Sequence, residues 1–418
     1  MLFFKECKKV IFSLTFIIYF AVTLAMYFTQ FHNDCGEPLR KPGPSDEYYG
    51  TVAREIPEIL MPNAAEGLVG EYLSGSFSAY PYGFYKNVRL SENKKFRLAE
   101  VITELSGLTA YELDNFEDYQ EAGYVMGDNN GFVYVEANIP EINIPDSLTY
   151  DRFRELMREA DKIIGGGSRY SDEFIVGNFS LVPRTYEDAL AEYERFLYDD
   201  KITGAYARLY CDYIGIDIAI LPVFVAAALA GFDKKSGMEQ LVYSRKVSSG
   251  KLVFTRFLAL VTVMAIPIII TAAIAYFKVK SIYPGEALDN FAFFRCAAYW
   301  LVPNILISTA VGMLVTEIMS GMIAIFVQGA WWFMSIFAAE GGLTGEIKPF
   351  TLVMRHNNLL KSDVFAMEMK SIIFNRLFFT VLSVVLVTLT VIIYEMKRRG
   401  VFNGLSDLRK NSGRKSKA

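Results

Sequence analysis

The sequence predicts an α-helical polytopic membrane protein with six transmembrane helices and a mainly helical (α+β) extracellular domain. Of the 418 residues, 52% are hydrophobic, which exceeds what the core of an ordinary soluble domain needs. Six apolar runs reach the roughly 18 to 20 residues that a helix needs to cross a bilayer. Residues 33–207 hold 32 acidic and 16 basic residues, so this segment carries about −16 and the remainder about +12.

The six apolar runs predict the transmembrane helices. They lie at residues 10–28, 214–232, 253–277, 296–316, 319–339 and 372–394. The first run carries aromatic residues to its end, and no clear small-residue cleavage site follows it. We therefore interpret it as an uncleaved helix rather than a secretory signal.

Basic residues at both ends of the chain predict the orientation. Lys5, Lys8 and Lys9 precede the first run, and eight Lys and Arg residues lie in the tail 397–418. Because short basic segments stay in the cytoplasm, both termini are expected to be cytoplasmic, and an even number of crossings agrees. The expected protein is a multi-pass protein of the plasma membrane, in contact with the lipid bilayer, with residues 33–207 outside.

This orientation divides the chain into four parts. Residues 1–32 are the cytoplasmic N-terminus and first transmembrane helix, and residues 33–207 are the extracellular domain. Residues 208–396 hold the other five transmembrane helices and a cytoplasmic loop at 233–252. The basic cytoplasmic tail covers residues 397–418.

Within the extracellular domain, residues 36–62 are rich in proline and are predicted to be a linker. Apolar periodicity and capping residues predict three helices. One follows Ser91 and ends at Gly107, one begins near Thr149 and ends in the glycine run 165–167, and one opens with the capping box Thr185-Tyr-Glu-Asp188. Weak alternation over 131–137 predicts some β structure.

The supply of reactive side chains argues against an enzyme. Only His32 and His356 are present, so no catalytic or metal site built on several histidines can form, and we expect no metal or cofactor. The glycine run 165–167 lacks the Gly-Lys-Ser/Thr ending of a phosphate loop and is interpreted as a helix stop. A membrane-embedded enzyme with an unrecognised site is the least favoured class.

Three of the four cysteines, Cys35, Cys211 and Cys296, fall on the predicted outer side. A bridge between Cys35 and Cys211 is one reading. The other is that they are ordinary small apolar residues, because no spacing rule favours pairing.

The loop after the second run is the most informative stretch. Met238, Leu241 and Val242 fall at helical spacing, which predicts a short amphipathic helix along the inner face of the membrane. The alternative is a solvated connecting loop.

In this loop the sequence resembles the type-2 family of ABC export permeases. The positions that match the family pattern are Asp233, Ser236, Gly237, Glu239, Leu241, Ser244, Ser249 and Arg256, whereas Met238 and Lys246 stand where Thr and Pro are usual. The resemblance implies a homodimer or heterodimer of permease subunits and a separate cytoplasmic ABC ATPase that carries out the hydrolysis. It also implies that the loop docks onto this ATPase through Asp233, Gly237, Met238, Glu239, Leu241 and Tyr243.

Asp217 lies inside the second run, where a central carboxylate costs about 2.5 to 3.5 kcal/mol. It is either a polar residue of a transport pathway or an outer-end carboxylate that is hydrated or paired near Asp212 and Arg208. Asn304 and Gln328 are interpreted as interhelical hydrogen-bonding residues.

Taken with the resemblance, these features predict the permease subunit of an ATP-driven exporter, with no nucleic-acid partner. The alternative is a non-transporting membrane receptor or scaffold whose extracellular domain binds a ligand. The sequence does not identify the substrate.

Overall fold

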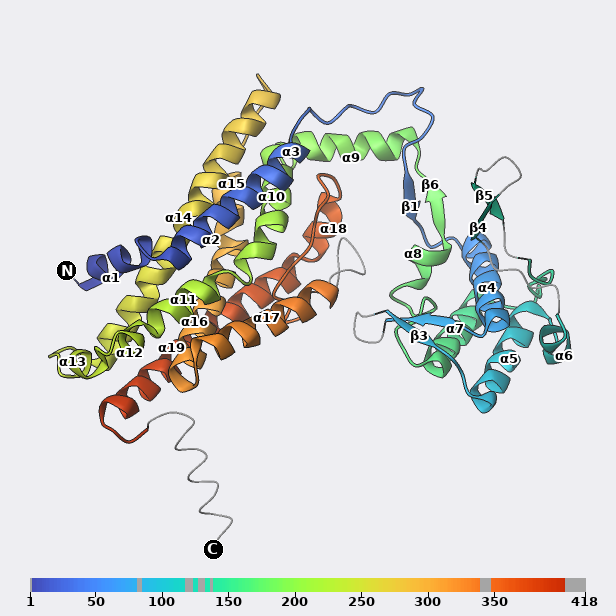
Figure 1. The fold of residues 1–418 in the computed structure, drawn as a ribbon. Coiled ribbons are helices and arrows are strands. Elements are labelled where there is room, and N and C mark those ends of the chain that lie inside the picture. Colours follow the sequence, from blue (N-terminus) through green and yellow to red (C-terminus); the bar gives the residue numbers. More distant parts are fainter. Residues whose placement is uncertain are drawn as a thin grey trace, which may run out of the picture. The chain divides into compact units, whose positions relative to one another are not determined.

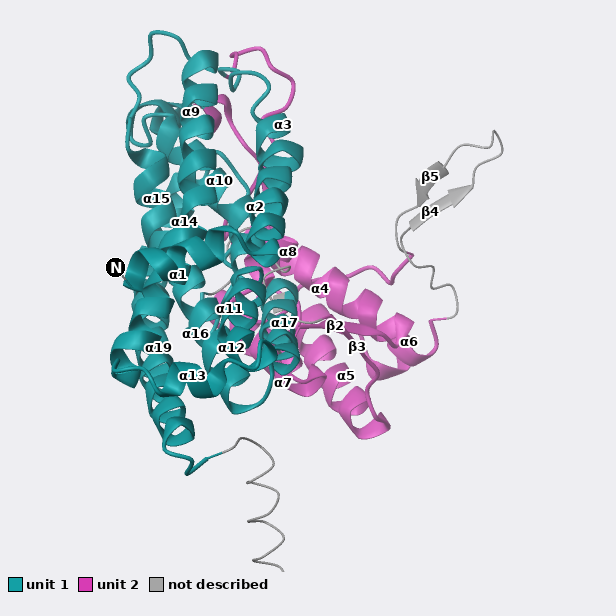
Figure 2. Cartoon of the chain, turned by 60° about the vertical axis from the view of Figure 1, so that its left-hand side comes forward, with its two compact units in different colours: residues 1–41, 190–418 teal, residues 42–189 magenta. Residues whose placement is uncertain are grey.

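The computed structural model describes residues 2–80, 85–116, 123–126, 132–135, 138–338 and 347–402. The chain forms two compact units, coloured separately in Figure 2. The larger unit combines residues 1–41 with 190–418, and the smaller unit consists of residues 42–189. The smaller unit lies entirely within the segment predicted as the extracellular domain.

The larger unit is a helical bundle (Figure 1). Its elements are α1 (Leu2–Ile11), α2 (Leu14–Met26), the π-helical turn η1 (Tyr27–Phe31), α3 (His32–Asp34), most of α9 (Tyr186–Tyr198), α10 (Thr203–Ile218), α11 (Pro222–Ala230), α12 (Phe232–Lys235), α13 (Glu239–Tyr243), α14 (Ser249–Ile282), α15 (Ala292–Trp300), α16 (Val302–Ile318), α17 (Gly321–Ala338), α18 (Ser362–Met367) and α19 (Met369–Arg398).

Five helical segments in the described residues are long and apolar enough to cross a membrane. They are Leu14–Asp34, Thr203–Ala230, Ser249–Ile282, Ala292–Ile318 and Met369–Arg398. Each corresponds to one predicted run. The run predicted at 319–339 forms α17, an apolar helix shorter than these five, and residue 339 lies outside the described residues. The chain is therefore an α-helical multi-pass membrane protein.

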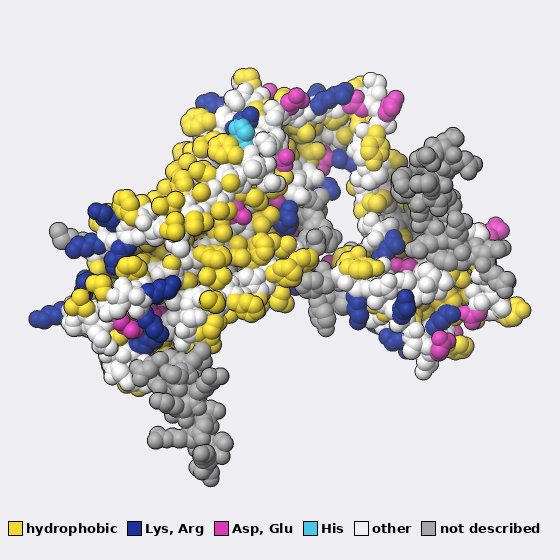
Figure 3. All heavy atoms as spheres, in the orientation of Figure 1, with side chains coloured by type: hydrophobic (Ala, Val, Ile, Leu, Met, Phe, Trp, Pro, Cys, Tyr) yellow, Lys and Arg dark blue, Asp and Glu magenta, His cyan; other side chains and the backbone are white. Residues whose placement is uncertain are grey.

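The surface of the bundle agrees with this class. Figure 3 shows hydrophobic side chains covering the visible face of the helices, while Lys and Arg side chains gather at the end formed by α1, α12 and α13. Large apolar side chains that remain exposed on the helices include Phe326 (76%) and Met322 (82%). In a bilayer such side chains contact lipid rather than water.

The first apolar run is divided between two helices, which differs from the single helix expected over 10–28. The Ser13 hydroxyl donates to the Val10 carbonyl at 2.7 Å and accepts the Phe16 amide at 3.2 Å. Ser13 therefore ends one helix locally and caps the next. The preceding helix, α1, buries Glu6 and Val10.

Two of the spanning segments are broken within their length. One is interrupted between α10 and α11, before Pro222, and the other at Leu301 between α15 and α16. At the first break, the Ala219 carbonyl accepts Gln328 Nε2 at 2.7 Å and Ser308 Oγ at 2.8 Å. Neighbouring helices thus satisfy backbone groups that the break releases. The interhelical role predicted for Gln328 is confirmed.

The smaller unit packs helices around one core, with three short antiparallel strand pairs. Its elements are β1 (Thr51–Ala53) paired with β6 (Leu181–Pro183), β2 (Phe77–Ala79) paired with β3 (Lys86–Val88), β4 (Gly123–Met126) paired with β5 (Phe132–Val135), and helices α4 (Pro57–Ser74), α5 (Glu92–Ser106), α6 (Ala110–Asp114), α7 (Tyr150–Ile164) and α8 (Ile175–Phe179). Leu68, Ile102 and Phe153 are fully buried at its centre.

The three helices and the β structure expected in this region are all present, as α5, α7, α9 and the pair β4–β5. Gly107 ends α5 in the left-handed conformation, and Thr149 caps α7. The linker predicted over 36–62 is wrong at its end, because α4 begins at Pro57. Proline suits the first turn of a helix, where its missing amide hydrogen has no partner to lose.

Candidate functional site

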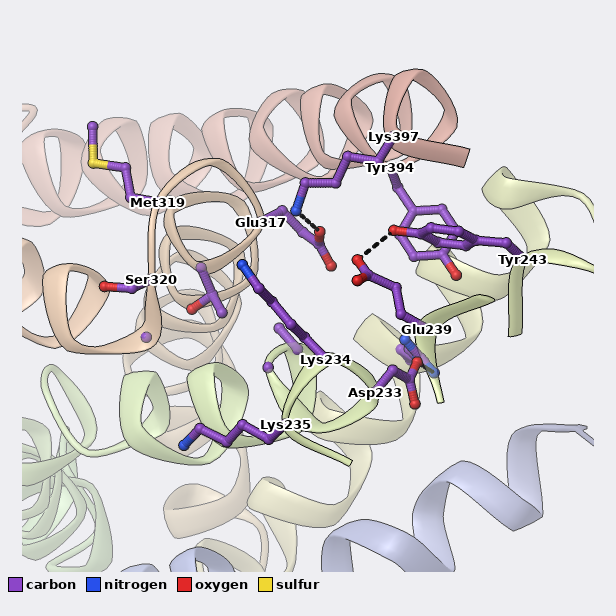
Figure 4. Close-up of a pocket in the computed structure, with 15 residues that line it drawn as sticks. Asp233, Lys234, Lys235, Glu239, Tyr243, Glu317, Met319, Ser320, Tyr394 and Lys397 are labelled. Carbon is purple, nitrogen blue, oxygen red and sulfur yellow. Dashed lines mark hydrogen bonds and ion pairs between the residues drawn. The ribbon is translucent and has the colours of Figure 1, made fainter. Parts of the chain in front are cut away.

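The predicted docking loop, 233–252, folds against one end of the bundle. Helices α12 and α13 of the loop, the turn between α16 and α17, and the end of α19 enclose a pocket of about 280 Å³ (Figure 4). Lys234 extends into this pocket. Its ammonium group makes no hydrogen bond or ion pair within the described part of the chain, so one positive charge there is not balanced by a direct contact.

Asp233 is engaged inside the bundle rather than presented to a partner. Its carboxylate accepts Arg256 Nη2 at 2.5 Å, and Arg256 Nε lies 3.6 Å from the second acid, Glu6. Glu6 is 3% exposed and Arg256 is 5% exposed. Lys9 completes the group, with Nζ 2.9 Å from Glu6. This charge network joins α1, α12 and α14.

Glu239 and Tyr243 form the side of α13 that faces the pocket. The Tyr243 hydroxyl donates to the Glu239 carboxylate at 2.7 Å, and the Tyr243 ring meets the edge of Tyr394 at a centroid distance of 5.4 Å. Burial and the neighbouring carboxylate raise the pKa of Tyr243 above its usual value. The Glu239 side chain is directed inward, as Figure 4 shows.

Leu241 lies on the outer side of the same short helix, and Met238 is the N-cap residue directly before it. The side chains of Met238 and Leu241 are 43% and 56% exposed. Gly237, directly before them, has φ +67, a conformation that favours glycine and turns the chain between α12 and α13. The predicted helix is present but spans only Glu239–Tyr243. The loop therefore presents two apolar side chains on one helical turn.

Arg398, at the end of α19, holds the loop in place. Its guanidinium donates to three carbonyls, those of Tyr243 at 2.9 Å, Arg245 at 2.9 Å and Val247 at 2.7 Å. The next pair along the same helix end is Lys397 with Glu317, 2.9 Å apart and largely buried. Hydrogen bonds from a charged donor are stronger than neutral ones. The loop is therefore fixed to the last helix.

We expect Arg398→Gln to loosen residues 239–249. Each lost hydrogen bond from a charged group is worth about 1.5 to 3 kcal/mol, so local amide hydrogen exchange should accelerate by about tenfold or more. Hydrogen–deuterium exchange with mass spectrometry measures this directly. Arg399→Gln is the matched control, because Arg399 is exposed and, among the described residues, pairs only with Glu395 on its own helix. Equal exchange in the two variants would contradict the role of Arg398.

Asp217 lies in α10, one residue before the break that follows Ile218. Its Oδ2 is buried and accepts no hydrogen bond within the described residues. The pairing considered from the sequence is not formed, because Arg208 binds Asp200 at 2.6 Å and Asp212 binds Arg355 at 3.1 Å. Asp217 is thus an unpaired carboxylate beside an irregular stretch of a spanning helix.

The segment 347–361 before α18 is irregular and partly buried rather than a regular helix. Asp212, which is fully buried, accepts the His356 amide at 2.5 Å and Arg355 Nε at 3.1 Å. Asn375 donates to three carbonyls of the same segment, those of Lys348, Pro349 and Thr351. Buried polar side chains therefore replace the regular backbone hydrogen bonds that this segment lacks.

The four cysteines Cys7, Cys35, Cys211 and Cys296 are free thiols in this structure. The bridge between Cys35 and Cys211, which the sequence left open, is not formed. Among the described residues, no group of three or more His, Cys, Asp or Glu side chains could hold a metal ion.

His356 makes stability depend on pH. Burial, with the nearby Arg208 charge, lowers the pKa of His356 from 6.5 to about 4. Between about pH 6.5 and about pH 4, His356 therefore binds a proton in the unfolded chain but not in the folded chain. The free energy of unfolding should fall as pH drops from about 6.5 to about 4, by on the order of 3 kcal/mol. His356→Phe should remove this part of the acid sensitivity in thermal unfolding. His32→Phe, the control, should retain it, and identical pH profiles for the two variants would disprove the assignment.

The sequence did not predict that Glu6, Arg398 and Arg376 make polar contacts inside the bundle. Arg376 had a visible signal, since it is a charged residue within the predicted run 372–394. Glu6 and Arg398 had none, because their partners are distant in sequence.

Comparison with protein-family models, curated proteins and solved structures finds no match for this chain.

Proposed function

We propose that this chain is the permease subunit of an ATP-driven exporter, working with a separate cytoplasmic ABC ATPase and as a homodimer or heterodimer of permease subunits. In this proposal α17 is the sixth transmembrane helix, both termini are in the cytoplasm of a cell whose plasma membrane holds the bundle, and residues 33–207 are extracellular. The support comes from the fold class, from the loop 233–252 and from the two broken spanning helices.

The observation that carries the proposal is an apolar, exposed turn on a firmly held loop. Met238 and Leu241 are exposed, whereas three hydrogen bonds from Arg398 and the ion pair of Asp233 fix the backbone beneath them. Apolar side chains on a rigid support are suited to fill a groove of a partner, with little loss of freedom on binding. Lys234, whose ammonium group has no hydrogen bond or ion pair among the described residues, adds a positive charge at the adjoining pocket that would favour an acidic partner surface.

The six predicted coupling residues have two different proposed roles. In this proposal the exposed Met238 and Leu241 contact the ATPase, and Gly237 shapes the turn before them. Glu239, Tyr243 and Asp233 are placed to support the loop from inside and are positioning residues in this proposal.

The two broken spanning helices are a further argument for the proposed transport function. In many secondary transporters, discontinuous helices near the middle of the membrane supply polar groups at the substrate site. Asp217 lies at one break, and Arg376 contacts the other. This support is by analogy with other transporter folds.

Cysteine labelling tests the proposed topology. In a variant without native cysteines, Tyr111→Cys in the smaller unit should react with a membrane-impermeant maleimide on intact cells, because Tyr111 is 77% exposed. Lys246→Cys, in the exposed part of the docking loop, should react only after permeabilisation. The reverse pattern, or labelling of both sites from the same side, would refute the orientation.

One observation favours the receptor or scaffold alternative, namely that residues 42–189 form a compact unit with its own core. Such a protein needs no ATPase. Copurification of the full chain with candidate ATPases therefore separates the two functions.

A further inference from the structure

Arg376 is a buried cation that has no acidic partner in the described part of the chain. It lies in α19 and is 5% exposed. Its Nη1 donates to the Asn304 side chain at 2.6 Å and to the Trp300 carbonyl at 3.1 Å. Its Nε and Nη2 are buried and make no hydrogen bond within the described residues. No described carboxylate lies within ion-pair distance of Arg376.

The other buried arginines of the described chain are paired. Arg208 is 2.6 Å from Asp200, and Arg256 is 2.5 Å from Asp233. Burying a guanidinium is costly unless an acid or several acceptors compensate it. Arg376 therefore differs from the other buried arginines of the described chain, each of which is paired with an acid.

The unpaired atoms form the edge of the guanidinium that recognises oxyanions. Nε and Nη2 lie side by side and can donate two parallel hydrogen bonds. The same edge of Arg152 binds the two oxygens of Glu104 at 2.6 and 2.8 Å in this chain. The ring of Phe379 lies 5.3 Å from the Arg376 guanidinium. The free edge therefore has the geometry that a carboxylate or phosphate requires.

The free edge of the Arg376 guanidinium lies near the break between α15 and α16. Trp300 and Asn304 flank the break between α15 and α16, and Pro303 lies directly after the break. Asn304 Nδ2 is also buried and makes no hydrogen bond within the described residues. Three donor groups, on Arg376 and Asn304, are thus buried near one another without acceptors.

We propose that Arg376 binds the carboxylate or phosphate group of an organic anion inside the bundle. This inference rests on the proposed transport function and deepens it, because it makes the transported molecule an amphiphilic anion. A lipid headgroup presents the same chemistry and is the second source that the experiment separates. Asn304 would offer a further hydrogen bond to the same group.

The experiment measures binding to the full chain without any ATPase. The protein is reconstituted in nanodiscs of phosphatidylcholine, and its thermal unfolding midpoint is recorded at constant ionic strength. The soluble probes are decanoate and inorganic phosphate, with decanol as the uncharged match for decanoate. A second set of discs contains phosphatidylglycerol. Because a ligand that binds only the folded state raises the midpoint, the dose dependence gives an apparent Kd.

We expect decanoate, but not decanol, to raise the midpoint of the wild type. Arg376→Gln should weaken the apparent Kd for decanoate by at least about tenfold, since two hydrogen bonds from a charged group are lost. Lys370→Gln, which removes an exposed charge from the same helix, should bind as the wild type does. A rise only in phosphatidylglycerol discs, absent in Arg376→Gln, assigns the site to a lipid headgroup instead of a transported anion.

Asn304→Asp keeps the inference testable if Arg376→Gln fails to fold. The new carboxylate would lie beside Arg376 Nη1 and neutralise it from within the chain, so the response to added anions should be lost while folding is retained. If no anion shifts the midpoint in either disc, or if Arg376→Gln or Asn304→Asp responds as the wild type does, water alone satisfies the Arg376 edge and the inference fails. Neither result depends on whether an ATPase docks.

Discussion

Leu241→Asp should abolish copurification of the proposed ABC ATPase and its stimulation by substrate, while the protein stays folded and inserted. The Leu241 side chain is 56% exposed, so a carboxylate there costs little in the isolated chain. In a partner groove the same carboxylate would be buried without a counter-charge, at a cost of several kcal/mol. A loss of about 3 kcal/mol weakens binding by more than a hundredfold.

Gln240→Asp is the matched control for this prediction, because it introduces the same charge at the neighbouring exposed position. It should bind the ATPase nearly as the wild type does. Glu239→Lys should also uncouple the two subunits, although by a different route. Its lysine would lose the hydrogen bond from Tyr243 and disturb the support beneath Leu241. Normal binding and stimulation in both Leu241→Asp and Glu239→Lys would remove the docking role and favour the receptor alternative.

Arg256→Gln should destabilise the bundle by about 3 to 5 kcal/mol. The substitution leaves Asp233, whose side chain is 15% exposed, without its cation, and it removes one of the two cations that contact the buried Glu6, which keeps Lys9. Breaking a buried ion pair from one side costs this much because the remaining charge stays desolvated. The measurement is thermal unfolding of the purified protein. The control is Arg245→Gln, since Arg245 lies in the loop that also contains Asp233, and its side chain is exposed.

The double variant Arg256→Gln with Asp233→Asn tests the cause of that loss. When the Asp233 carboxylate is removed together with the Arg256 guanidinium, no unpaired charge remains at position 233. Part of the stability should therefore be recovered, and the two effects should not be additive. Additive losses would show that Arg256 acts through packing rather than through charge.

Much of the fold could be predicted because the bilayer imposes a minimum length on apolar segments. Five of the six predicted runs correspond to helices able to span a membrane, and capping residues located the helices that follow Ser91, Thr149 and Thr185. The start of helix α4 was missed because the proline-rich residues 36–62, which include Pro57 and Pro62, were interpreted as a linker. Both positions are helical in the fold, and Leu68 on this helix is fully buried in the core.

The candidate site was predictable only in part, because contacts between distant residues leave no mark in a single sequence. The spacing of Met238, Leu241 and Val242 correctly predicted a helical turn. It could not reveal that Arg398 fixes the loop from 151 to 155 residues away. It also could not show that Glu239 faces inward. The breaks in the spanning helices were not predicted because the apolar runs continue through them, although Pro222 and Pro303, in the first turns of α11 and α16, were a signal.

The position of Glu6 has a consequence for the order in which the protein assembles during synthesis. Its partner Arg256 is made 250 residues later, which at ribosomal speed is a delay of roughly 10 to 50 s. Throughout that time α1 cannot form its native ion pair with α14. The Glu6 carboxylate must stay hydrated at the membrane surface until the third apolar run has been inserted. Helix α1 is therefore synthesised well before α14 but can reach its final place only after α14 has been inserted.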